Sequence, residues 1–199
     1  MKSIQFFFIA ALLVMISPGC KDQQTSSEEN QPPVEVEPDY MSEGKEIAAR
    51  TFGVLSSTLQ QAISTDGVPG AISLCNLKAY PLVDSLSEAF DVEIRRTSLN
   101  TRNPRNNPTM QETVVLDRYQ ETVQNGGELK PLVETLGDGR HAFYAPITVN
   151  AFCLKCHGVI GETLDERHYA LIRERYPNDK AIDYADGDLR GIWSIVFED

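Results

Sequence analysis

Basic residues are scarce in this sequence. The 199 residues include 18 Lys and Arg against 29 Asp and Glu, which gives a formal net charge of −11. Proteins that bind nucleic acid obtain most of their affinity from Lys and Arg side chains that neutralise phosphates. The charge balance therefore predicts no nucleic-acid partner. The hydrophobic content of 41% is ordinary for a globular protein, so a wholly disordered chain is also excluded.

Long apolar runs are missing as well. The longest, Phe6 to Ile16, has eleven residues, whereas a membrane-spanning helix needs about 20. An apolar run of this length behind Lys2 is typical of a secretory signal. It ends in Ser17-Pro18-Gly19-Cys20, which is similar to a bacterial lipobox, although Ser17 and Pro18 depart from the usual residues. We predict that residues 1–19 are a lipoprotein signal peptide and that Cys20 is lipidated; the alternative is simple secretion.

The segment after Cys20 lacks aromatic residues. From Lys21 to Asp39 it contains six acids, one base and three prolines. A segment of this composition buries too little apolar surface to fold by itself. We therefore expect residues 20–39 to be an acidic, proline-containing tether and residues 40–199 to be a single domain. The predicted location is outside the cytoplasm, with the lipid in a bacterial membrane and the domain facing the periplasm or the cell surface.

The folded part lacks internal repeats and lacks the alternation of strands and helices that is typical of parallel sheets. Apolar periodicity predicts four helices, over residues 42–64, 71–90 (broken near Pro81), 110–124 and 163–176. Alternating or β-branched runs predict four strands, over residues 92–99, 127–136, 141–149 and 191–197. Gly137-Asp138-Gly139 predicts a hairpin turn between the second and third strands. The mixture predicts an α+β fold.

Cysteines are few, and one motif uses two of the four. Residues 153–157 read Cys-Leu-Lys-Cys-His, the CxxCH pattern of c-type haem attachment. Two thiols at this spacing reach the two vinyl groups on one edge of the porphyrin, and the next residue places an imidazole under the iron. We predict one covalent haem c bound through Cys153 and Cys156, with His157 as an axial ligand. Export favours this interpretation, because haem c is attached outside the bacterial cytoplasm.

Three other uses of these cysteines are possible. A thioredoxin-like dithiol needs only the CxxC but typically stands near a βαβ pattern, which is absent. A zinc site could combine Cys153, Cys156 and Cys75 with a histidine, but His157 directly beside Cys156 is an awkward chelate, and there is no second paired motif. A plain disulfide is the third alternative.

Cys75 has no cysteine left to pair with in the haem interpretation. A free thiol is unusual in an oxidising compartment. Cys75 is either a small buried apolar residue in its helix or the second axial ligand of the iron. Four other side chains could fill that position: His141, His168, Met41 and Met110. A Met/His or His/His pair would be typical of an electron carrier.

Six segments together resemble the Tll-like family of c-type haem domains. They are residues 71–76, 94–99, 102–108, 144–147, 153–158 and 187–191. The resemblance extends from about Tyr40 to the C-terminus and implies a PAS-like fold, an antiparallel sheet with surrounding helices and one haem. It implies that His157 and Cys75 are the iron ligands. Arg96 and Arg102 lie in matching segments and could bind the two haem propionates; otherwise they are ordinary surface arginines.

Three functions are compatible with these features. The first is a low-potential redox or small-ligand sensing or accessory module, because a thiolate ligand stabilises ferric iron. Its partners would be a redox or signalling protein and a small gaseous or redox ligand. The second is a monohaem electron-transfer protein of the periplasm. The third, a peroxidase-type enzyme, needs an open iron site and distal acid and base residues, for which we find no motif, so no enzymatic activity is expected.

Overall fold

The computed structural model describes residues 39–198. The predicted signal peptide, Cys20 and the predicted tether up to residue 38 lie outside the described residues. The described residues form one compact unit. Among the described helices, none combines the length and the apolar character that crossing a bilayer requires.

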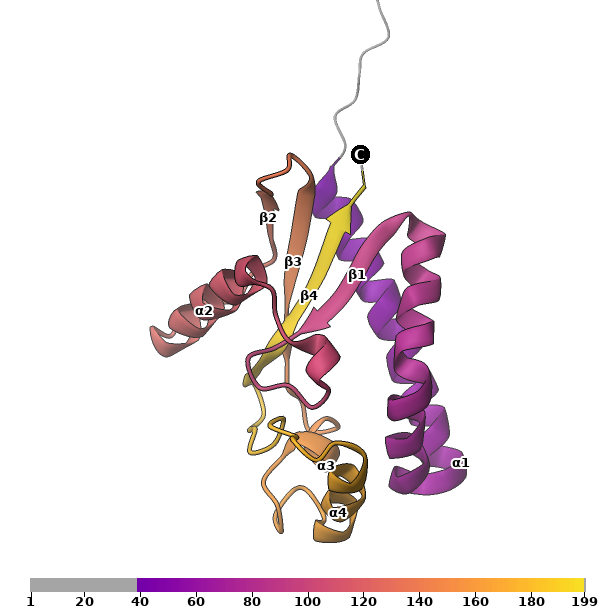
Figure 1. The fold of residues 1–199 in the computed structure, drawn as a ribbon. Helices are drawn as coiled ribbons and strands as arrows, with labels where there is room; N and C mark the ends of the chain where they lie inside the picture. The colour runs from indigo at the N-terminus through magenta and orange to yellow at the C-terminus, as the bar shows by residue number, and fades with distance from the viewer. Residues whose placement is uncertain (1–38, 199) are drawn as a thin grey trace, which may run out of the picture. The chain divides into compact units, whose positions relative to one another are not determined.

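Four antiparallel strands form one sheet in the order β1-β4-β3-β2 (Figure 1). They are β1 (Val92–Thr97), β2 (Leu132–Thr135), β3 (His141–Thr148) and β4 (Leu189–Phe197). The last strand of the chain therefore lies in the middle of the sheet, between the first strand and the β2–β3 hairpin. Every residue of β4 from Gly191 to Phe197 is buried. Such continuous burial requires cover on both faces.

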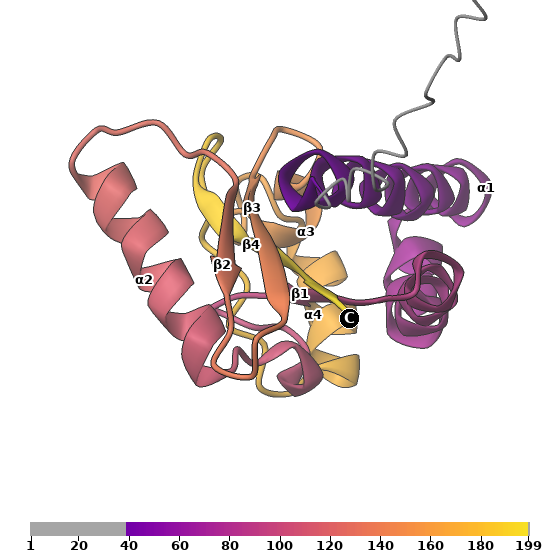
Figure 2. The same cartoon turned by 90° about the horizontal axis from the view of Figure 1, so that it is seen from above.

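Helices supply that cover, with α1 (Tyr40–Phe90) on one face and α2 (Met110–Gln124) on the other (Figure 2). The core on the α1 side is formed by Ile47, Ala48, Val83, Val92, Ile94, Phe143, Trp193, Ile195 and Phe197. The core on the α2 side is formed by Val115, Leu116, Tyr119, Ala142, Tyr144, Ile192 and Val196. Helices and an antiparallel sheet packed in this way confirm the predicted α+β class.

The element α1 is a hairpin of two helical arms that lie side by side (Figure 1). The arms meet at Gly67, the one position inside the element with non-helical dihedrals (φ 67°, ψ −170°). Glycine adopts this backbone conformation without steric cost, and Pro69 fits the first turn of the second arm because its nitrogen needs no partner there. The break predicted near Pro81 is wrong, because the second arm continues through Pro81. Buried Ala79 and Val83 pack this arm against the rest of the domain and offset the lost hydrogen bond.

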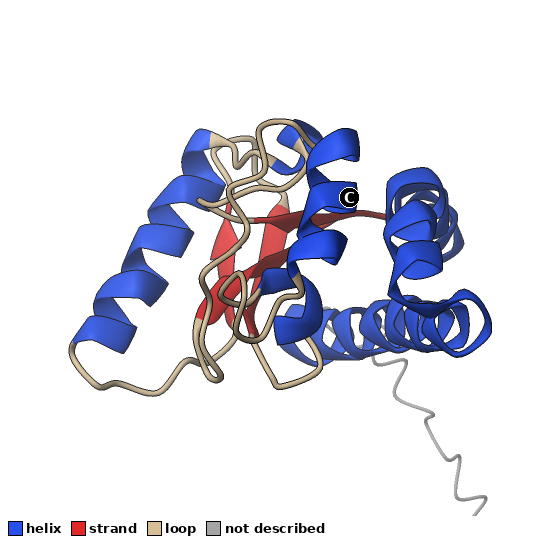
Figure 3. Cartoon of the chain, turned by 90° about the horizontal axis from the view of Figure 1, so that it is seen from below, coloured by secondary structure: helices blue, strands red, loops and turns tan. Residues whose placement is uncertain are grey.

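The connection from β3 to β4 forms a lower layer at one end of the sheet (Figures 1 and 3). It contains the single turn α3 (Leu154–His157) and α4 (Glu166–Arg175). A third apolar cluster, Ile72, Leu164, Ile172 and Tyr176, joins this layer to the second arm of α1. The predicted helix 163–176 starts three residues later than expected, because Asp165 caps it through the Arg167 amide. The layer places the CxxCH motif beside the arm that carries Cys75.

Candidate functional site

The CxxCH motif occupies a tight turn that leads into α3. Asn150 begins the turn, since its Oδ1 accepts hydrogen bonds from the backbone amides of Phe152 at 2.9 Å and Cys153 at 3.3 Å. The amide of His157 then donates to the carbonyl of Cys153 at 3.0 Å. Residues three and four positions apart lie on one face of a helical turn. The two thiols and the imidazole therefore share one side, which is the arrangement that CxxCH attachment requires.

His157 has a fixed orientation. Its Nδ1 lies 2.7 Å from the carbonyl oxygen of Ala181, and a carbonyl can only accept, so Nδ1 carries the proton and Nε2 has the free lone pair. The ring also meets the ring of Tyr184 edge-on, at 6.4 Å between centroids. Burial, followed by the charges of Arg190 and Arg102, lowers the pKa of His157 well below its ordinary value. The imidazole is therefore neutral at pH 7, the form that ligates a metal.

Cys75 approaches this motif from the second arm of α1. Solvent reaches its side chain, yet desolvation by the surrounding protein raises the pKa of the thiol, while Arg96 and Arg102 act in the opposite direction. Burial also raises the pKa of Cys156, and the charges of Arg102 and Cys75 affect it too. The arm that carries Cys75 lies against the CxxCH turn, because Ile72 and Cys156 belong to one apolar cluster. A neutral thiol here would lose its proton on binding iron.

Arg102 joins several parts of the lower layer. Its Nη2 donates to the carbonyl oxygens of Cys156 at 2.6 Å and Ala181 at 3.1 Å. The same nitrogen lies 3.2 Å from Oδ2 of Asp179, whose side chain is fully buried. This part of the guanidinium is therefore already occupied by protein oxygens, while Nε is buried without a partner among the described residues. The propionate contact expected for Arg102 stays a prediction.

Arg96 and Arg190 have fewer partners. The guanidinium carbon of Arg96 lies 5.7 Å from the Trp193 ring; between residues 39 and 198 it has no hydrogen bond or ion pair. Arg190 lies over Tyr184 at 5.3 Å and donates to the carbonyl of Asn100 at 3.2 Å. Its Nε is buried and unpaired within the described part of the chain. Burial lowers the pKa of both arginines, and buried charges of this kind are stabilised by an anionic partner.

The charges at this site fit a haem. The charges of Arg102 and Arg96 both act on buried Arg190, and Asp179 pairs with Arg102. A dicarboxylate group would balance the remaining positive charge, and a haem carries two propionates. The donor set of two thiols, a neutral imidazole and a further thiol also suits covalent attachment and two axial bonds. The residues present therefore match the group that the motif implies.

Arg190 was not among the residues predicted from the sequence. The available signal was its place in Gly187-Asp188-Leu189-Arg190-Gly191, one of the segments that carry the family resemblance. Gly191 helps to position it, since a Cβ on Gly191 would collide with the carbonyl oxygen of Thr97 on β1. The strands can therefore approach closely enough to bring Arg190 near the end of β1.

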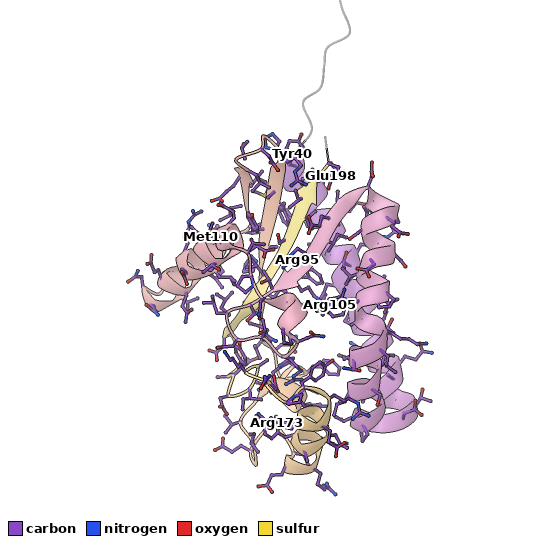
Figure 4. The ribbon with its side chains drawn as sticks, in the orientation of Figure 1. Tyr40, Arg95, Arg105, Met110, Arg173 and Glu198 are labelled. Carbon is purple, nitrogen blue, oxygen red and sulfur yellow. The ribbon has the colours of Figure 1, made fainter. Side chains whose placement is uncertain are left out.

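Most other candidates for an axial ligand lie elsewhere. His141 stacks on Tyr40 at 4.3 Å between centroids, at the end of the sheet opposite α3. Met110 is 89% exposed at the start of α2, and Met41 is in the first turn of α1; Figure 4 labels Met110 and Tyr40 far from the lower layer. His168 is on α4, at the same end of the sheet as α3 (Figure 1). Among residues 39–198, no three His, Cys, Asp or Glu side chains form a metal-binding group.

Comparisons with known proteins identify a matching family and a similar structure. A family model described as Tll0287-like matches residues 22–197. A crystal structure of the cyanobacterial heme-protein Tll0287 is similar, with 25% sequence identity and a TM-score of 0.56. The matched part covers 79% of this chain and 91% of that one. No curated protein matches the chain significantly.

Proposed function

Because the chain belongs to the Tll0287-like family, we propose that it binds one c-type haem, covalently attached through Cys153 and Cys156. His157 and Cys75 are the proposed axial ligands of the iron. The observation that carries the proposal is that the arm carrying Cys75 packs on the CxxCH turn, through the apolar cluster that contains Ile72 and Cys156. The sheet with its covering helices would then serve as a PAS-like platform for the haem.

The haem would supply one-electron chemistry at iron, and the protein side chains would set its conditions. His157 presents Nε2 because Nδ1 is bound to Ala181. Arg96 and Arg190, which have few partners of their own, would neutralise the propionates together with Arg102. A thiolate ligand stabilises ferric iron and lowers the reduction potential. If His157 and Cys75 both bind the iron, the protein would leave no open coordination site for peroxidase chemistry.

These features support a low-potential redox or small-ligand sensing or accessory module. Its partners would be a redox or signalling protein and a small ligand or oxidant that changes the state of the iron. A lipid on Cys20 would hold the domain at a bacterial membrane, facing the periplasm or the cell surface. The acidic composition gives no basis for a nucleic-acid partner.

A monohaem electron carrier is the second candidate. It is favoured by the exposure of the CxxCH turn, because Cys153 and Cys156 are only partly buried. An attached haem edge at this surface would be accessible to a redox partner. The two candidates differ in the iron potential that they require.

The decisive experiment is spectroscopy of the mature protein with its haem. We expect a pyridine haemochrome of c type and a mass increase of one haem, both lost in Cys153→Ala/Cys156→Ala. Ferric wild-type protein should show low-spin thiolate features by electron paramagnetic resonance (EPR), which Cys75→Ala should abolish. His168→Ala is the control for the alternative ligand at this end of the sheet and should keep them. A wild-type spectrum in Cys75→Ala would exclude Cys75 as a ligand.

A further inference from the structure

The carbonyl oxygen of Ala181 receives two hydrogen bonds. His157 donates through Nδ1 at 2.7 Å, and Arg102 donates through Nη2 at 3.1 Å. The three residues come from different segments: Arg102 from the loop after β1, His157 from α3, and Ala181 from the loop before β4. Arg102 and the imidazole of His157, the proposed iron ligand, therefore share one hydrogen-bond acceptor.

Asp179 holds this arrangement in place. Its Oδ1 accepts from the amide of Ala181 at 2.9 Å, and its Oδ2 lies 3.2 Å from Nη2 of Arg102. The neighbouring amide of Lys180 donates to the carbonyl of Thr101 at 3.1 Å. The loop before β4 is thus attached to the loop after β1 by both backbone and side chain, which fixes the position of the shared carbonyl.

We propose that Arg102 is a positioning residue for His157, orienting the imidazole through the Ala181 carbonyl and limiting its electron donation to the iron. The inference rests on the proposed function, in which His157 is an axial ligand. A carbonyl that also accepts from a cationic donor has less electron density to offer a second donor. The His157 N–H therefore keeps its proton more fully, and the ring has less imidazolate character. Ferric iron is then less stabilised than it would be by an unshared hydrogen bond.

The positive charge of Arg102 acts in the same direction. A cation near the iron favours the ferrous state, in which the iron carries one positive charge less. Asp179 partly compensates that charge because the two side chains form an ion pair. Arg102 would therefore raise the reduction potential of the iron, and Asp179 would lower it.

A second ion pair with a buried carboxylate, between Arg95 and Glu112, offers a control. Arg95 lies 3.1 Å from Glu112, whose side chain is 4% exposed. This pair joins β1 to the start of α2 and has no contact with the CxxCH turn. Loss of either arginine leaves a buried carboxylate unpaired, which is strongly destabilising. Only loss of Arg102 should also change the reduction potential and the EPR spectrum of the iron.

The test compares Arg102→Gln with Arg95→Gln in the haem-loaded protein. In Arg102→Gln we expect the ferric-to-ferrous ratio at fixed potential to rise on the order of tenfold, equivalent to a midpoint lower by about 59 mV for a one-electron couple. The EPR g-values of the low-spin ferric form should shift as well. Arg102→Lys, which keeps the charge, should recover part of the potential. Arg95→Gln should lose stability but keep the wild-type potential and spectrum.

If Arg102→Gln does not fold, Asp179→Asn provides the second arm, with a midpoint expected to move upward because Arg102 then lacks its counter-charge. Wild-type potentials and g-values in folded variants would overturn the inference. Absence of a c-type haemochrome from wild-type protein would instead overturn the proposed function, so the two failures are distinguishable.

Discussion

The guanidinium of Arg96 lies over the ring of Trp193, with 5.7 Å between the guanidinium carbon and the ring centroid. This contact holds a positive charge on the sheet, facing the arm of α1 that carries Cys75. Arg96 has no ion-pair partner within residues 39–198, so its charge is available to pair with a haem propionate. We therefore expect Arg96 to influence how the reduction potential of the haem depends on pH.

In wild-type protein we expect a midpoint potential that changes little between pH 5 and 8, because arginines keep the propionates ionised. In Arg96→Gln or Arg190→Gln, a propionate should titrate within this range. Its protonation at low pH removes a negative charge and favours ferrous iron, so the midpoint should rise as pH falls. Potentiometric titration at several pH values measures the effect. Arg173→Gln, which removes an exposed arginine of α4 (Figure 4), is the control and should behave like wild type.

The potential of the wild-type protein separates the two proposed functions. Thiolate and histidine ligation should place the midpoint below that of the standard hydrogen electrode, since a thiolate stabilises ferric iron. Spectroelectrochemical titration of the purified domain gives the value directly. A midpoint well above the hydrogen electrode would favour the electron carrier and would argue against ligation by Cys75.

Two glycines in the first arm of α1 should respond oppositely to alanine. A Cβ on Gly44 would collide with the side chain of buried Phe143 on β3, whereas a Cβ on Gly53 would meet nothing within 4 Å. Gly44→Ala should cost about 1–3 kcal/mol through overpacking. Gly53→Ala should stabilise by roughly 0.5–1 kcal/mol through helix propensity. Guanidinium denaturation followed by circular dichroism measures both, and equal midpoints would show that α1 does not pack closely on β3.

Alkaline pH should destabilise the domain through Tyr119. Burial raises the pKa of Tyr119 to about 12, and its hydroxyl donates to the carbonyl of Lys130 at 2.8 Å. A folded pKa above the ordinary 10 means that this stability is complete below pH 10. It is lost as pH rises from about 10 through about 12, at about 1.4 kcal/mol per unit of pKa difference.

Tyr119→Phe tests this directly. It should cost about 1 kcal/mol at pH 7 by removing the hydrogen bond and should also reduce the decline above pH 10. Part of the decline should persist, because burial also raises the pKa of Tyr144 to about 12. Denaturant midpoints measured from pH 8 to 11.5 would show both effects, and an unchanged alkaline slope in the variant would contradict the assignment.

The predicted lipid anchor of the protein can be tested at Cys20. We predict that Cys20→Ser prevents lipidation and releases the protein from membranes in cell fractionation. Labelling with a radioactive fatty acid should mark the wild type alone. Retention of the serine variant in the membrane fraction would mean that Cys20 is not the anchor.

Local structure was largely predictable from the sequence. The helix at 110–124 has the predicted bounds because Thr109 and Glu112 form a capping box at its start, and its apolar residues recur with helical period. The hairpin around residues 137–139 also appeared where the glycines indicated a turn. The break predicted at Pro81 did not occur. The lost hydrogen bond of a proline is visible in the local sequence, whereas the packing that offsets it comes from distant residues.

The signal for the proposed haem attachment was likewise local. Five consecutive residues, 153–157, specify two thiols and an imidazole on one face of a turn, and no distant residue is needed to recognise them. The roles of the arginines were not local. Arg102 and Arg190 donate their hydrogen bonds to residues between 54 and 90 positions away, so their surroundings depend on how the loops meet.

The sequence by itself determined the CxxCH motif, the α+β class and most helices and strands, because each depends on spacing within a short segment. Only the tertiary structure decided which side chains surround the motif. The reversal at Gly67 and the central position of β4 bring Cys75, Arg96 and Arg190 toward residues 153–157, and the loop at Asp179 engages Arg102. The burial and the electrostatic environment of such a site depend on side chains from distant segments, and no short stretch of sequence specifies them.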